Sequence, residues 1–169
     1  MEEKKYFVGR FSLSDHKAVL NVTGYVEKAK NYIDSLFFFS LNPHNGQAIN
    51  IKLNSIEMRA LANAIEHIAY QPKGSDTNHT KESGASNTKS TLTISSNEKY
   101  HYVGIAKGNL EPVQVSFKDF ELLALSQELK KLIDEVVSST YKTQRHIERK
   151  KEEALRLEDE KKELENAKK

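Results

Sequence analysis

Hydrophobic and polar positions follow the same order twice along this chain. A shift of 64 residues places residues 38–68 on residues 102–132 without a gap. In each copy, apolar residues first alternate with polar ones, as in a strand, and then recur three and four positions apart, as in a helix. The chain is therefore expected to repeat one strand-then-helix unit. Aligned apolar pairs include Ile49 with Val113, Ile51 with Val115, Leu53 with Phe117, Leu61 with Leu125 and Ile65 with Leu129.

The same pattern predicts the individual elements of both copies. Expected strands lie at residues 6–13, 17–26, 36–41 and 48–53 in the first copy, and at 91–95, 99–106 and 113–117 in the second. A helix is expected from residue 54 to about 70 and another from about 118 onward.

The two helix starts differ in their capping residues. Asn54 and Glu57 have the spacing of a capping box. In the second copy Lys118 takes the capping position, and Ser116 or Asp119 is the expected substitute. The paired acids Glu57 and Glu121 are interpreted as carboxylates that bind free amides at the start of each helix.

Residues 71–88 are rich in Gly, Ser, Asn, Thr and Lys and predict a mobile connector between repeats at about 4–70 and 89–137. A fourth strand of the second copy is either hidden in this run or absent. The expected fold is α+β: a duplicated unit of four strands and a helix, with two antiparallel sheets packed against helices, over residues 1–139. Residues 140–169 are expected to form a charged helical tail, in which Glu158 and Lys162 can pair.

Composition and charge narrow the class of protein. The chain has no Cys, which fits a reducing compartment, and its apolar runs are too short to cross a membrane. We expect a soluble cytoplasmic protein that makes no membrane contact. Its formal net charge is only +2, but the predicted strands and loops are slightly basic and the predicted helices slightly acidic. A weak positive field is therefore expected at a sheet face.

The residues that carry catalysis in other proteins are scattered here. The six His residues show no i,i+4 pairing, and the chain contains no HExxH, phosphate-binding Gly loop or Gly-x-Ser-x-Gly motif. We expect a protein that is not an enzyme, with no catalytic residue, metal site or cofactor.

At the second predicted strand the sequence resembles a known family. Residues 17–22 (KAVLNV) resemble the second half of the lysine-glycine-lysine-alanine-alanine-leucine strand motif of the Whirly single-stranded-DNA-binding proteins, and residues 89–94 (KSTLTI) are a degenerate echo in the second copy. The helix starts are also similar, and the resemblance spans about residues 5–137. Asp15 and His16 depart from it, because they stand where the first Lys and the Gly of the motif would be. PUR-domain proteins, which use similar repeats, are a second relative by topology.

The resemblance implies binding of single-stranded DNA with little sequence preference. We expect the protein to protect or organise strands in replication, recombination or repair, in a phage or plasmid setting. For a phage-encoded protein the location would be the host cytoplasm. RNA binding by the same fold and an oligomeric scaffold or adaptor remain as alternatives. Because single strands bind to cations and aromatic faces, the candidate contact residues are Tyr6, Arg10, Lys17, Tyr25, Phe38, Lys52, Lys99, Tyr100, Tyr102 and Lys107.

Assembly is a further expectation from the resemblance. Whirly-type proteins associate through their helices, which implies a homo-oligomer, with a tetramer first and a dimer second. Apolar helix positions such as Met58, Leu61, Leu125 and Leu129 offer more surface than one small sheet needs to cover. The charged tail is expected to add to assembly or to recruit a protein partner.

Overall fold

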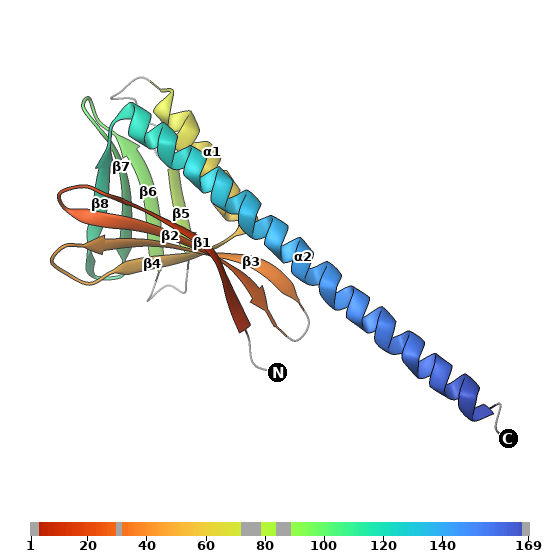
Figure 1. Ribbon diagram of the computed structural model, residues 1–169. Helices are drawn as coiled ribbons and strands as arrows, with labels where there is room; N and C mark the ends of the chain where they lie inside the picture. Colours follow the sequence, from red (N-terminus) through yellow and green to blue (C-terminus); the bar gives the residue numbers. More distant parts are fainter. Residues whose placement is uncertain (1–3, 30–31, 72–78, 84–88, 167–169) are drawn as a thin grey trace.

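The computed structural model describes residues 4–29, 32–71, 79–83 and 89–166, and contains two four-stranded antiparallel sheets, each followed by a helix (Figure 1). Sheet 1 has the order β1-β2-β3-β4, and sheet 2 has the order β5-β6-β7-β8. The elements of the first copy are β1 (Lys4–Ser14), β2 (Ala18–Lys28), β3 (Ile33–Pro43), β4 (Ile49–Asn54) and α1 (Ser55–Ala69). Those of the second copy are β5 (His79–Ser83), β6 (Ser90–Ser96), β7 (His101–Lys107), β8 (Leu110–Phe117) and α2 (Asp119–Asn166).

The predicted duplication is confirmed by the strand register. In sheet 1, Phe37 lies opposite Leu53. In sheet 2, His101 lies opposite Phe117, which is the same pair moved by 64 residues. The two sheets therefore repeat not only the order of their strands but also the pairing of individual residues.

The prediction of a connector over residues 71–88 was wrong for part of that run. His79–Ser83 form β5, which pairs antiparallel with β6 from Ser90 to Ile94. The fourth strand of the second copy is thus present, inside the run that was expected to be mobile. Residues 72–78 and 84–88, which the prediction also covers, lie outside the described residues.

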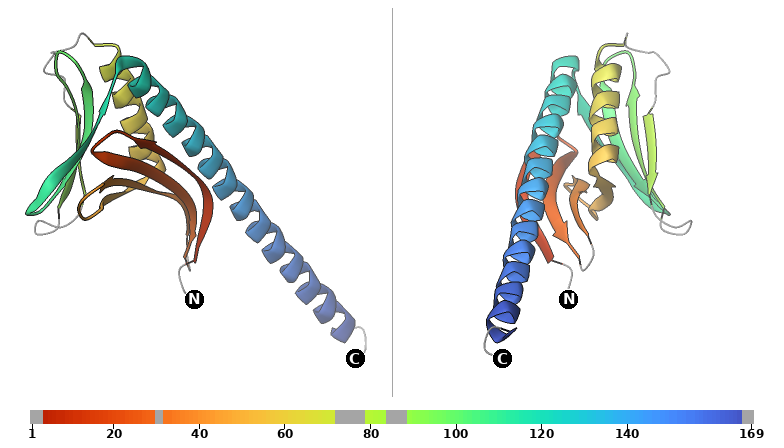
Figure 2. Two further views of the ribbon diagram at one scale, coloured as in Figure 1. Left: turned by 60° about the vertical axis from the view of Figure 1, so that its left-hand side comes forward. Right: turned by 90° about the vertical axis from the view of Figure 1, so that its right-hand side faces the viewer.

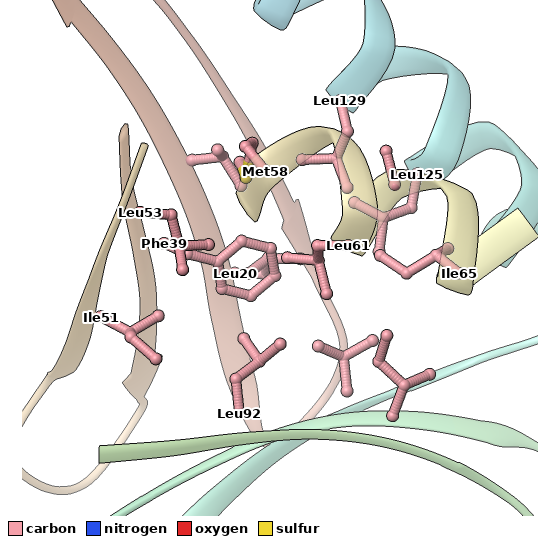
Figure 3. Close-up of a cluster of buried hydrophobic side chains, with 14 of the residues drawn as sticks. Leu20, Phe39, Ile51, Leu53, Met58, Leu61, Ile65, Leu92, Leu125 and Leu129 are labelled. Carbon is pink, nitrogen blue, oxygen red and sulfur yellow. The ribbon is translucent and has the colours of Figure 1, made fainter. Parts of the chain in front are cut away.

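Both sheets and both helices share one hydrophobic core. Figure 3 shows Leu20, Phe39 and Ile51 of sheet 1 near Leu92 of sheet 2, with Leu61 of α1 beside them. The apolar helix residues Met58, Leu61, Ile65, Leu122, Leu125, Leu129 and Leu132 are all at most 4% exposed. They were expected to leave apolar surface for assembly, and this was wrong, because the core of the chain itself buries them.

Each helix start uses a Glu three residues after its capping position, as predicted. Asn54 and Glu57 form a capping box: the Asn54 side chain accepts from the Glu57 amide at 2.9 Å, and the Glu57 carboxylate accepts from the Asn54 amide at 3.0 Å. In α2, Glu121 accepts from the Lys118 amide at 2.7 Å. Ser116, one expected substitute for the missing cap, instead donates its hydroxyl to Asp15.

Two glycines let α2 lie close against sheet 1. Gly9 and Gly24 are opposite each other on β1 and β2. A Cβ at Gly24 would overlap Cγ2 of Val136, and one at Gly9 would lie 3.0 Å from Cδ1 of Leu132. The absence of a side chain at both positions therefore allows the helix to pass directly over these strands.

The predicted helical tail is the continuation of α2. This helix crosses β1, β2 and β3 and then extends well beyond both sheets as one rod (Figure 2). Glu158 and Lys162 form the predicted ion pair at 3.1 Å. None of the described residues belongs to a helix with the length and apolarity needed to cross a membrane.

Candidate functional site

Aromatic side chains on three neighbouring strands meet on the face of sheet 1 that points away from the core, here called the outer face. Phe7 of β1, Tyr25 of β2 and Phe38 of β3 form this aromatic row. The rings of Phe7 and Tyr25 have centroids 6.0 Å apart, and those of Tyr25 and Phe38 are 5.8 Å apart, both edge to face. Phe7 is 63% exposed, so one end of the row is open to solvent.

Three cationic side chains flank the aromatic row. Lys52 of β4 lies opposite Phe38 in the strand register. The Lys5 Nζ atom lies 5.7 Å from the centroid of the Phe38 ring, which is within cation–π range. Arg10 lies opposite Thr23 and donates to the Asn21 side chain at 3.1 Å. The outer face thus combines flat apolar rings with positive charges at short range.

One carboxylate is embedded in the same face. Glu27, two residues after Tyr25 on β2, is only 5% exposed. Its oxygens lie 3.4 Å from Lys5 Nζ and 3.6 Å from Lys52 Nζ, and the Tyr32 hydroxyl donates to it at 3.4 Å. The negative charge is therefore compensated by two of the three cations beside the aromatic row.

A β-bulge in β1 decides which aromatic residue joins the row. Phe7 lies opposite Tyr25 and Gly9 lies opposite Gly24, so that Val8 is the extra residue. A one-residue insertion reverses the alternation of side chains on the strand. Tyr6 consequently lies opposite Val26, which is buried on the helix side. Tyr6, one of the predicted contact residues, therefore does not lie on this surface, whereas Phe7 and Lys5, which the sequence analysis did not name, do.

Of the ten predicted contact residues, Arg10, Tyr25, Phe38 and Lys52 come together on the outer face of sheet 1. The others are dispersed. Lys17 lies in the turn before β2, at a cavity of about 440 Å³ between the two sheets. The remaining four are Lys99 and Tyr100 in the β6–β7 turn, Tyr102 on β7 and Lys107 at the end of β7.

The outer face of sheet 2 differs from that of sheet 1. Tyr102 lies there between Ser95 and Ser116, and its hydroxyl accepts from Asn97 at 2.8 Å. Its neighbours on this face are mostly small: Thr91, Thr93, Gly104 and Ala106. The two repeats therefore share a backbone pattern but present different surfaces.

Asp15, where the family motif would have Lys, ties the two sheets together. One carboxylate oxygen accepts from the amide and the hydroxyl of Ser116 in β8, at 2.9 and 2.8 Å, and the other accepts from the amides of Lys17 and Ala18. Burial acts to raise the pKa of Asp15, but these hydrogen bonds outweigh it and lower the pKa from 3.8 to about 2. The stability that the folded protein gains from the ionised Asp15 carboxylate is therefore fully present above pH 3.8 and is lost as the pH falls towards 2.

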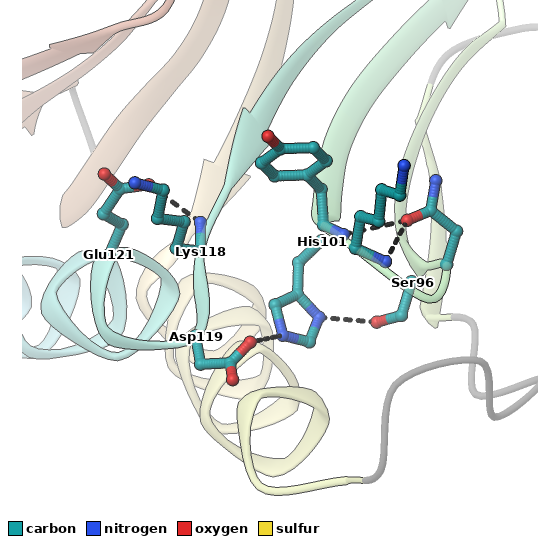
Figure 4. Close-up of polar contacts among 8 residues, drawn as sticks. Ser96, His101, Lys118, Asp119 and Glu121 are labelled. Atoms are coloured by element: carbon teal, nitrogen blue, oxygen red, sulfur yellow. Dashed lines mark hydrogen bonds and ion pairs between the residues drawn. The ribbon is translucent and has the colours of Figure 1, made fainter.

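A buried histidine anchors the start of α2 to sheet 2 (Figure 4). The ring nitrogens of His101 lie 2.6 Å from the Ser96 hydroxyl and 3.0 Å from the Asp119 carboxylate. Although these are the residue types of a hydrolase triad, the His101 side chain is only 1% exposed, so no substrate reaches its ring. Within the part of the chain that the structure describes, no group of three or more His, Cys, Asp or Glu residues is placed to hold a metal ion.

Comparison with known proteins identifies the fold. No protein-family model and no curated protein matches the chain. Among solved structures, the chain is similar to WHY1 from Arabidopsis thaliana, with a TM-score of 0.60 and 12% sequence identity, over 83% of this chain and 91% of that chain. The chain thus has a Whirly-like fold, as the strand motif and the repeated helix starts predicted.

Proposed function

We propose that this protein binds single-stranded DNA, with little sequence preference, on the outer face of sheet 1. The observation that carries the proposal is the aromatic row of Phe7, Tyr25 and Phe38 with Lys5, Arg10 and Lys52 beside it. Unpaired bases stack on aromatic faces at about 1–3 kcal/mol per base, and cations bind the phosphates between them. The Whirly-like fold adds support, because the family resemblance implies the same ligand.

Low sequence preference follows from the chemistry of the face. Every base has a flat ring that can stack, whereas sequence readout needs several hydrogen bonds to base edges. The protein would then act on any exposed strand without catalysing a reaction. We place this role in the cytoplasm, in protecting or organising strands during replication, recombination or repair, in a phage or plasmid system.

Selective, salt-sensitive binding of single strands is the direct test. We expect fluorescence anisotropy to show higher affinity for labelled oligo(dT) than for a duplex of the same length. Affinity should fall as salt rises, by about 0.7 log units per tenfold change in salt for each phosphate neutralised. The reason is that bound lysines and arginines displace counterions from the strand.

An RNA oligonucleotide of the same length belongs in the same titration. If the protein binds RNA more tightly than DNA, RNA is the better candidate for its ligand. The outcome is open to test because stacking and phosphate contacts exist in both nucleic acids. Failure to bind any of the three nucleic acids, or equal binding of strand and duplex at every salt concentration, would contradict the proposal and favour the scaffold alternative.

We also propose that the protein is a homo-oligomer, with a tetramer first and a dimer second. The support is apolar surface left open on the helices: Ile56 of α1 is 80% exposed, Phe120 of α2 is 66% exposed, and Leu155 and Leu157 on the extended part of α2 are more than half exposed. Linking several outer faces in one particle would increase the affinity for long strands.

Light scattering on the full chain and on a chain ending at Ser139 separates the roles of the helices. We expect the full chain to have a mass of more than one subunit, and the shortened chain to form particles with fewer subunits. Both should keep their affinity for a short oligo(dT). A monomeric full chain would refute assembly. Loss of strand binding by a shortened chain that still forms the oligomer would instead assign the tail to the binding surface.

A further inference from the structure

The unusual feature of the outer face is that its two best-placed lysines are already paired with a carboxylate. Glu27 is 5% exposed and lies within 3.6 Å of both Lys5 Nζ and Lys52 Nζ. Both lysines remain open to solvent, with 40% and 55% of their side chains exposed. Their ammonium groups can therefore be reached by another anion without unfolding the sheet.

Glu27 also influences access to the aromatic row. The Lys5 side chain starts on β1, the edge strand, and its Nζ atom lies both beside Glu27 on β2 and 5.7 Å from the Phe38 ring on β3. The carboxylate thus helps to hold a cation over a ring on which a base would stack. For a base to use that ring, Lys5 has to move aside.

We propose that Glu27 competes with the phosphates of a bound strand for Lys5 and Lys52, and so limits the affinity of the outer face. This inference rests on the proposed function. A phosphate that approaches either ammonium group also approaches the carboxylate and is repelled by it. If the phosphate draws the lysines outward, Glu27 loses the pairing that compensates its burial, which is costly for a charged group. Both effects make the binding of the strand weaker.

Glu27→Gln removes the charge and keeps the size of the side chain. We expect it to bind oligo(dT) between about threefold and tenfold more tightly than the natural protein at low salt, with the difference shrinking as salt screens the charges. The salt dependence of the affinity should also steepen, because lysines released from Glu27 displace more counterions. A structural role alone would not change that slope.

Asp34→Asn is the matched control. Asp34 lies directly opposite Glu27 on β3 and carries the same charge, but it is exposed and accepts from the Ser35 amide. We expect its replacement to change the affinity less than twofold. As a second check, the gain from Glu27→Gln should become smaller when Lys5 and Lys52 are both replaced by Met, because the competition for the cations is then absent and only direct repulsion by Glu27 remains.

The outcomes separate this inference from the proposed function. If the natural protein binds oligo(dT) and Glu27→Gln binds equally or more weakly, the inference is overturned and Glu27 serves to position the lysines. An equal gain from Asp34→Asn would also overturn it, as a general charge effect. If neither protein binds any nucleic acid, the proposed function itself fails. Should Glu27→Gln lower the thermal stability, Glu27→Met, which is apolar and of similar size, must show the same gain.

Discussion

Replacing Tyr25 with alanine is expected to weaken binding to oligo(dT) by about 5- to 150-fold, the loss of about 1–3 kcal/mol for one stacked base. Tyr25 is the middle ring of the aromatic row and contacts both Phe7 and Phe38. Its removal takes away one stacking face and the support of the other two. Anisotropy titrations at one fixed salt concentration measure the change, and Tyr25→Phe should keep the affinity within about twofold, because the ring remains.

Tyr6→Ala is the control for the choice of face. Tyr6 is an exposed tyrosine on the adjacent strand, but the bulge at Val8 places it on the helix side of sheet 1. Its replacement should leave strand binding unchanged. Equal losses from Tyr6→Ala and Tyr25→Ala, or no loss from Tyr25→Ala with the fold intact by circular dichroism, would show that the strand binds elsewhere.

Gly24→Ala is expected to lower the free energy of unfolding by about 1–3 kcal/mol. The added methyl group would overlap Cγ2 of Val136, whose branched side chain is rigid and fully buried between α2 and the sheet. For a chain of this length, the midpoint of thermal unfolding should fall by about 2–4 °C per kcal/mol. Thermal denaturation followed by circular dichroism measures the effect.

Two other glycines serve as controls at the same protein concentration. Gly104→Ala on sheet 2 should have little effect, because its Cβ would lie 3.5 Å from the nearest atoms, which is an ordinary contact. Gly9→Ala should fall between the two, since the end of the Leu132 side chain can move. If Gly24→Ala is as stable as Gly104→Ala, α2 does not lie as close to sheet 1 as the structure indicates.

The fold could be predicted from the sequence where the apolar residues recur at a regular spacing. Alternation over residues 48–53 and 113–117, each followed by a helical period, was enough to predict the duplicated unit and both helix starts. β5 could not be predicted this way, because the sequence of His79–Ser83 (HTKES) contains no apolar residue. It is a strand because it pairs with β6, which is a tertiary interaction.

The candidate site could be predicted only in part, for a different reason. The sequence named Tyr25, Phe38 and Lys52 as candidate contacts, and the structure brings them to one face because β2, β3 and β4 pair without a break. The face on which Tyr6 lies could not be predicted, since the bulge in β1 leaves no mark in the period of the apolar residues. The pairing of Glu27 with Lys5 and Lys52 joins three strands, and no spacing within one segment could have revealed it.

Because α2 is one unbroken helix, its length determines how far a molecule bound at its end lies from the two sheets. At about 1.5 Å per residue, residues 140–166 reach about 40 Å past the point where the helix leaves the core. A molecule that docks on the last turns would stand several nanometres from Tyr25, too far to compete for the same surface. Neighbouring copies on one strand would also need room for these rods, so the spacing of copies along a strand would depend on the direction in which each helix points.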